Sequence, residues 1–174
     1  QSYVLITGNI DLSIGSVVGM SCMISATLMT KGINPWIAVG ITFICCILVG
    51  VLNGQLVAKC KLPPFIATLG TMTIARGIAQ IVNNNYNTDS IGDGAQAFRD
   101  FFYYGKFLGV YNTIWIAVVL WILFNFLLSK TRTGRHIYAI GSNVEAARLS
   151  GVNVVASTTK AYVVSSVCAC VVGL

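Results

Sequence analysis

Titratable side chains that would support chemistry are scarce in this sequence. The single histidine, His136, has no carboxylate pair and no nucleophile beside it in a catalytic pattern. The six cysteines lack the paired spacing and the nearby histidines of a zinc site, and no GxxxxGK[ST] phosphate-binding motif occurs. The sequence therefore predicts no enzyme, no metal site and no bound cofactor, and it predicts that this chain does not hydrolyse ATP itself.

Two charged residues stand within or beside long apolar runs, where an ionisable group often marks a functional position. Arg76 lies in TIARGIAQ, and Asp11 lies in TGNIDLSIGS. Arg76 has two interpretations: it lines a translocation path, or it is a structural residue whose long side chain reaches the membrane interface or pairs with a polar group elsewhere. The scarcity of carboxylates in the apolar runs counts against a proton- or sodium-coupled carrier.

Uncharged polar residues in the same runs extend the set of candidates for a polar path. These further candidates are Ser13, Asn53, Gln55, Thr68 and Thr71. Asn53 and Gln55 have a second interpretation as hydrogen-bonding residues between neighbouring helices.

The composition indicates an integral membrane protein. Of the 174 residues, 56% are hydrophobic and only 9% are charged, whereas soluble domains carry about 25% charged residues. So few charges cannot cover a water-exposed globule. The formal net charge is +6, but basic and aromatic residues do not alternate as they do where nucleic-acid bases stack. We therefore interpret the basic residues as orientation signals and expect membrane lipid, not nucleic acid, around the chain.

Four apolar runs are long enough to cross a bilayer as helices, which takes about 20 residues. The predicted spans are 12–29, 36–58, 65–82 and 113–128. A fifth run opens near Ala161, and residues 4–6 resemble the end of an earlier one, so we expect partial spans at both ends. The predicted fold class is an all-α polytopic transmembrane bundle, and the chain (1–174) is expected to be a fragment of one transmembrane domain.

The distribution of basic residues predicts the orientation of these spans. Five basic residues and a single acid, Glu145, fall in the segment 130–160, which the positive-inside rule places in the cytoplasm. The short loop with Lys59 and Lys61 then also lies in the cytoplasm. The polar, aromatic-rich segment 83–111 becomes an extracytoplasmic loop. The five basic residues are Lys130, Arg132, Arg135, Arg148 and Lys160.

Two local patterns predict how the helices are built and packed. Gly15 with Gly19, and Gly50 with Gly54, form GxxxG pairs that let helix backbones approach closely in lipid. The stretch VLITGNIDLSIGS interrupts an apolar run with Gly8, Asn9 and Asp11. It is interpreted either as a helix break near a transport path or as an ordinary cytoplasmic turn capped by Asp11.

A short helix over 144–150 is predicted within the cytoplasmic segment. Ser142 and Glu145 have the S-x-x-E spacing of a capping box, and Gly151 is a natural stop. A helix of about two turns is marginal in water, so something must hold it. Either it docks on a partner or it packs on its own membrane helices, and the residues alone leave both interpretations open.

Three stretches carry a resemblance to a known family. TGNIDLSIGS, LPPFIATLGTMTIARG and GRHIYAIGSNVEAARLSGVNV occur in order between Thr7 and Val154. Together they resemble the membrane permease subunit of bacterial ATP-binding-cassette importers for simple sugars, the ribose/xylose/galactoside group. One departure is that Asn9 replaces the second glycine of the family pattern Gly-Gly-Ile-Asp-Leu-Ser. By resemblance, the helix that couples the permease to its ATPase consists of Glu145, Ala146, Ala147, Arg148, Leu149, Ser150 and Gly151.

The resemblance also implies a function and a set of partners. It implies import of ribose-like monosaccharides by alternating access across the bacterial cytoplasmic (inner) membrane, with ATP and Mg held by a separate ATPase subunit. A periplasmic or lipoprotein sugar-binding protein and a second permease copy complete the expected assembly. The alternatives are a permease for branched-chain amino acids or nucleosides, an ion-coupled carrier or channel, and, least supported by the residues, a membrane enzyme.

Overall fold

Five long helices form most of the computed structural model, which describes residues 1–84, 86, 95–107 and 109–174. Part of the predicted 83–111 loop therefore lies outside the described residues. The helices are α2 (Ile14–Thr30), α3 (Pro35–Ala58), α4 (Pro64–Val82), α6 (Asn112–Lys130) and α9 (Val154–Gly173). All except α2 are long and apolar enough to cross a membrane. The predicted all-α multi-pass bundle is confirmed.

The first predicted span agrees with its helix to within two residues, whereas the last run starts earlier than expected. The first predicted span is the shorter helix α2, whose 17 residues cover about 25 Å. The last run, expected to open near Ala161, is a helix of 20 residues that begins earlier, at Val154. The Asn153 side chain accepts a hydrogen bond from the Ala156 N–H at 2.9 Å and caps this start. Lys160 therefore belongs to α9 and not to the connecting segment.

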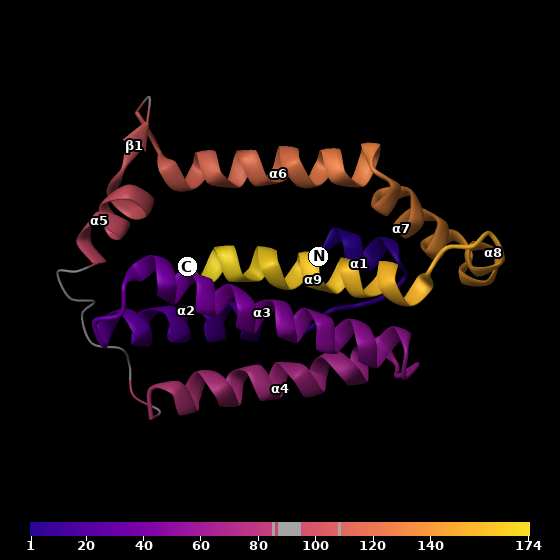
Figure 1. Cartoon of the computed structure of the whole chain (residues 1–174), viewed down its shortest axis with the longest axis horizontal. Coiled ribbons are helices and arrows are strands. Elements are labelled where there is room, and N and C mark those ends of the chain that lie inside the picture. Colours follow the sequence, from indigo (N-terminus) through magenta and orange to yellow (C-terminus); the bar gives the residue numbers. More distant parts are fainter. Residues whose placement is uncertain (85, 87–94, 108) are drawn as a thin grey trace.

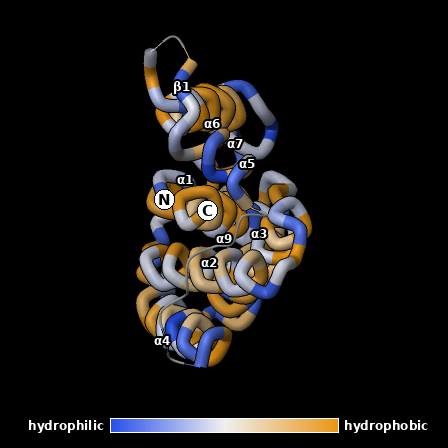
Figure 2. Tube along the Cα trace, turned by 90° about the vertical axis from the view of Figure 1, so that its left-hand side faces the viewer, coloured by the Kyte–Doolittle hydropathy of each residue, from blue (hydrophilic) through white to orange (hydrophobic). Residues whose placement is uncertain are grey.

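Consecutive long helices run antiparallel and are joined at alternating ends of the bundle (Figure 1). Seen end-on, α3 and α9 lie in the middle, α2 packs against both, and α4 lies beyond α2 (Figure 2). The main hydrophobic core fills the space among these helices and includes Val17, Met20, Cys46 and Cys170, all nearly or fully buried.

Gly50 and Gly54 allow the close contact between α3 and α9. A Cβ at Gly54 would lie 2.5 Å from the Thr159 Cα, and one at Gly50 would lie 2.8 Å from the Val163 Cα. Both positions are closer than a real Cβ comes to another atom, so close packing at this GxxxG pair is confirmed. Gly15 and Gly19 were expected to pack in the same way, but a Cβ at either meets nothing within 4 Å.

Replacing Gly54 with alanine is expected to destabilise the bundle by about 1–3 kcal/mol, because the new methyl group forces α3 away from the α9 backbone. Gly70→Ala is the matched control, since a Cβ there meets nothing within 4 Å. Unfolding in detergent, followed by tryptophan fluorescence, measures both variants. Equal midpoints for Gly54→Ala and the wild type would contradict the close contact.

Helix α6 stands apart from the other long helices (Figure 2) and has no buried residue. One direct link is the Tyr3 hydroxyl, which donates to the Phe124 carbonyl, while the two rings meet edge to face at 6.2 Å. At its beginning, α6 contacts η2 (Asp100–Tyr104), which follows α5 (Gln96–Arg99), and the hairpin strands β1 (Lys106–Phe107) and β2 (Val110–Tyr111).

Three short helices complete the described fold at and near the other end of the bundle. These are α1 (Ser2–Ile6), α7 (Arg132–Ser142) and α8 (Val144–Leu149). Helix α7 had not been predicted as a separate element. Its signals are the Thr131 side chain, which accepts from the Gly134 N–H at 3.4 Å, and the buried Ile137 and Ile140 on one face.

The α7–α8 segment and the Lys59/Lys61 loop lie at the same end of the bundle, and residues 95–107 and 109–111 lie at the opposite end (Figure 1). We call the first of these the basic end. It carries Lys59, Lys61, Lys130, Arg132, Arg135 and Arg148. The common location of the two basic segments agrees with the arrangement that the charge distribution predicts.

Candidate functional site

A non-helical segment, which we call the break, separates α1 from α2, and its last residues are polar and buried. Helix α1 stops at Ile6, Gly8 has a left-handed φ of +76°, and α2 starts at Ile14. Asp11 is only 2% exposed, and Ser13 is fully buried. The structure therefore shows a break with a buried carboxylate and not an ordinary surface turn, which would leave that carboxylate in water. That the break lies near a transport path stays a prediction.

Asn9, which replaces the second glycine of the family pattern, does not disturb this break. The left-handed residue is Gly8, so position 9 needs no glycine. The Asn9 side-chain amide instead donates to the Thr7 hydroxyl at 2.8 Å. The substitution adds a local hydrogen bond to the turn.

Asp11 accepts hydrogen bonds from three donors. The Ser13 N–H and hydroxyl donate to one carboxylate oxygen at 3.0 and 2.6 Å. The Ser165 hydroxyl of α9 donates to the other oxygen at 3.2 Å. A buried carboxylate is costly unless it is hydrogen-bonded, and these donors supply that compensation without a cation.

The network continues from Ser13 into two further helices. The Asn53 side-chain amide of α3 donates to the Ser13 hydroxyl at 3.0 Å. The Thr71 hydroxyl of α4 lies 2.7 Å from the Asn53 side-chain oxygen, to which it donates. We call Asp11, Ser13, Asn53, Thr71 and Ser165 the buried network. It joins the start of α2 to α3, α4 and α9.

Among the described residues, the side chains of the other predicted path residues make no hydrogen bond to this network, although the Thr71 hydroxyl also donates to the Thr68 backbone carbonyl at 3.1 Å. Gln55 donates to the Thr159 hydroxyl at 3.3 Å, and Thr68 donates to backbone carbonyls of its own helix. Arg76 is exposed and makes no hydrogen bond or ion pair with the residues that the structure describes. Ser165 was not among the predicted residues, and its signal is the pair of serines inside the apolar run VVSSVCAC.

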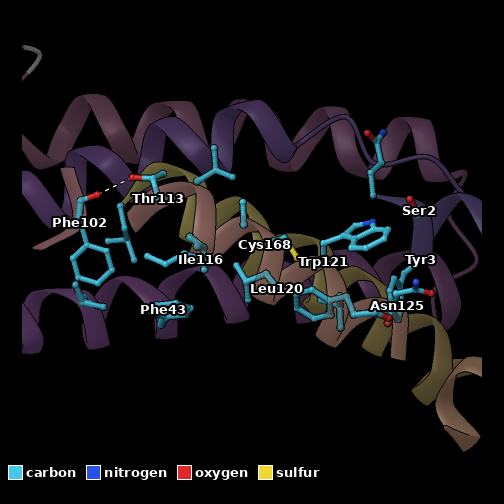
Figure 3. Close-up of a pocket in the computed structure, with 18 of the residues that line it drawn as sticks. Ser2, Tyr3, Phe43, Phe102, Thr113, Ile116, Leu120, Trp121, Asn125 and Cys168 are labelled. Carbon is cyan, nitrogen blue, oxygen red and sulfur yellow. Dashed lines mark hydrogen bonds between the residues drawn. The ribbon is translucent and has the colours of Figure 1, made fainter. Parts of the chain in front are cut away.

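An apolar groove of about 890 Å³ lies between α6 and helices α1, α3 and α9. Figure 3 shows Phe43, Ile116, Leu120 and Trp121 along it, with a few polar groups such as Asn125. A sugar carries hydroxyl groups on every side, and burying them without partners is unfavourable. We therefore do not regard this groove as a sugar-binding site.

Helix α8 lies at the tip of the basic end and begins after Asn143. The Asn143 side chain accepts from the Glu145 and Ala146 N–H groups, both at 3.0 Å. The capping box predicted for Ser142 is therefore wrong: Ser142 is the last residue of α7, and Asn143 is the cap. Gly151 ends the helix as predicted, with φ +81° and the paired hydrogen bonds of a Schellman motif.

Replacing Asn143 with alanine is expected to destabilise α8 by about 1 kcal/mol, because two N–H groups lose their acceptor. Ser142→Ala is the matched control and is expected to change the stability by less than about 0.5 kcal/mol. Hydrogen exchange of the Glu145 and Ala146 amides checks both variants. Faster exchange in Ser142→Ala than in Asn143→Ala would reinstate the capping box.

The two sides of α8 differ in exposure. Ala147 is 4% exposed and packs on the chain itself, whereas Leu149 is 88% exposed. Arg148 and Glu145 form an exposed ion pair at 3.0 Å across one turn. The outer side of α8 therefore presents one large apolar side chain next to an exposed ion pair.

Four helices long and apolar enough to cross a membrane define a multi-pass membrane protein. The chain belongs to the family described as branched-chain amino acid transport system / permease component, which matches residues 3–174. No solved structure shows a significant match.

Similar curated proteins are sugar import permeases. The chain is 33% identical to the fructose import permease of Bifidobacterium longum over its whole length, covering 49% of that protein. It is 34% identical to the ribose import permease of Bacillus subtilis, with 88% of the chain and 47% of that protein covered. It is 35% identical to the L-arabinose transport permease of Escherichia coli, with 99% and 51% covered. The chain thus spans about half the length of these relatives.

Proposed function

We propose that this chain forms part of the permease subunit of an ATP-driven importer for simple sugars in the bacterial cytoplasmic membrane. The names of the fructose, ribose and arabinose relatives support a monosaccharide as cargo. The basic end faces the cytoplasm in this proposal, following the positive-inside rule. The permease moves the sugar unchanged by alternating access, and a second permease copy completes the pathway.

The exposed face of α8 is the proposed contact through which ATP hydrolysis drives transport. The segment Glu145–Gly151 docks on a separate ATPase subunit, which holds ATP and Mg, and the exposed Leu149 is the main apolar contact. A periplasmic or lipoprotein binding protein delivers the sugar at the opposite end. The helix is short, but its Asn143 cap and the buried Ala147 hold it in place without the partner.

The translocation path follows the buried network. Asp11, Ser13, Asn53 and Thr71 are buried in this conformation, and in the proposal they line the path when the broken helix moves. Gln55 and Thr68 lie on the same two helices, α3 and α4, and belong to the proposed path at its cytoplasmic half. Arg76, further along α4, belongs to the outer half.

Reconstitution tests the proposed function. The permease is placed in liposomes with its ATPase, and each candidate sugar is added with its binding protein. We expect one monosaccharide and its binder to stimulate ATP hydrolysis and sugar uptake together. Uptake that persists without ATP, or that follows an imposed ion gradient, would favour the carrier alternative.

A permease for branched-chain amino acids is the second candidate, because the family description names that cargo. The same liposomes distinguish the two candidates. Leucine or valine with a cognate binding protein would stimulate hydrolysis in that case, and ribose, arabinose and fructose would not. A nucleoside binder added in the same assay tests the remaining cargo class.

A further inference from the structure

The end of α7 crosses the end of α1 in direct backbone contact at Gly141. A Cβ at this position would lie 1.8 Å from the Ile6 carbonyl oxygen and 3.0 Å from its carbonyl carbon. A real Cβ does not approach another atom that closely, so a residue with a side chain cannot occupy this crossing without moving one helix. Nearby, Ile137 of α7 and Val4 of α1 are both fully buried in one hydrophobic cluster with Tyr162.

On one side of this contact lies α8. Gly141 is only two residues before Asn143, which caps α8 and whose own N–H donates to the Ala139 carbonyl of α7 at 3.1 Å. The two helices are therefore joined by a single hydrogen-bonded residue. A displacement of α8 cannot be absorbed by a flexible linker and must move the end of α7.

On the other side lies the break that leads to the buried network. The left-handed Gly8 follows two residues after Ile6. Beyond it, the Ile10 carbonyl accepts from the Tyr162 hydroxyl at 3.2 Å, and Asp11 is held by Ser165 of α9. The break thus touches α7 at its first residue and is anchored on α9 at its last. Gly8, between these points, is a position at which the backbone can change direction.

We propose that Gly141 is a positioning residue that transmits movement of α8 to the break between Ile6 and Asp11. Packed helices move as bodies, so the contact at the Ile6 carbonyl carries the movement to Gly8 and to the buried network. This inference rests on the proposed docking of an ATPase on α8. It adds the route by which that docking reaches the membrane interior.

The test uses Gly141→Ala in the assembled transporter, with ATPase and binding protein, in liposomes. We expect the amount of sugar imported per ATP hydrolysed to fall by about tenfold, while the ATPase still binds and hydrolyses ATP. A general loss of folded protein would lower both activities together and leave that ratio unchanged. Gly40→Ala is the matched control, because a Cβ at Gly40 meets nothing within 4 Å.

A second variant decides the matter if Gly141→Ala does not accumulate in the membrane. Gly8→Ala leaves the α7 crossing intact and meets no atom within 4 Å, but it strains a backbone with φ +76°. We expect it to lower the same ratio. An unchanged ratio in Gly8→Ala, or in an assembled Gly141→Ala transporter, would overturn the inference. If the wild-type permease recruits no ATPase, the proposed function fails, and that outcome is visible before either variant is examined.

Discussion

Replacing Leu149 with aspartate is expected to abolish ATP-driven import without unfolding the permease. The side chain is 88% exposed, so its removal costs the isolated chain little. Burying a leucine against a partner contributes about 1.5–3 kcal/mol, and a charge placed in the same apolar contact is unfavourable. ATPase affinity should therefore fall by about tenfold to a hundredfold. Co-purification of the ATPase with the permease, together with sugar uptake, measures the effect.

Ile81 offers a control of similar size and exposure. It is 76% exposed at the other end of the bundle, so Ile81→Asp tests whether any new surface charge disturbs the assembly. ATPase binding is expected to survive this change. If Leu149→Asp retains both ATPase binding and uptake, α8 is not the docking helix.

Replacing Asp11 with alanine is expected to lower the stability of the bundle by about 2–4 kcal/mol and to stop transport. Three donors from Ser13 and Ser165 lose their acceptor, and a buried unsatisfied donor costs about 1–3 kcal/mol. The expected total is smaller than the sum of three such costs, because freed hydroxyl groups in a membrane protein find other partners. An average interhelical hydrogen bond contributes only about 0.6 kcal/mol to stability. Thermal unfolding in detergent and uptake in liposomes measure the two effects.

Asp11→Asn is the informative companion to that variant. The amide keeps one oxygen for the Ser13 donors, and its N–H can donate to the Ser165 hydroxyl. We therefore expect it to recover most of the lost stability. If asparagine and alanine destabilise the bundle equally, the negative charge, not the hydrogen bonds, holds the break in place.

The bundle could be predicted from length and composition, because crossing lipid requires about 20 apolar residues. The predicted boundaries of α3, α4 and α6 differ from the observed ones by at most two residues. The start of α9 could not be found in this way. Its first turns hold Ser157 and Thr158, which are polar by type but buried by neighbouring helices. The hydropathy of a residue type does not show whether neighbouring helices bury that residue.

The prediction of the polar path residues was incomplete for a similar reason. Asp11, Ser13, Asn53 and Thr71 meet in one network, but their partner Ser165 lies 154 residues from Asp11 in the chain. Such a pair depends on how α9 is rotated about its axis, which no local pattern encodes. The prediction of the α8 cap failed for a different reason. Ser142 and Asn143 are both good capping residues, and the backbone conformation decides which of them caps the helix.

The way Asp11 is already occupied has a consequence for how cargo would travel. Asp11 offers about four acceptor positions, and donors from Ser13 and Ser165 take three of them. A sugar hydroxyl in the proposed path could therefore add at most one hydrogen bond here without displacing a serine, and any further bond would replace one of the same kind. In the proposed importer, the net affinity at this point would be small, so capture would belong to the binding protein outside and the membrane passage would serve turnover.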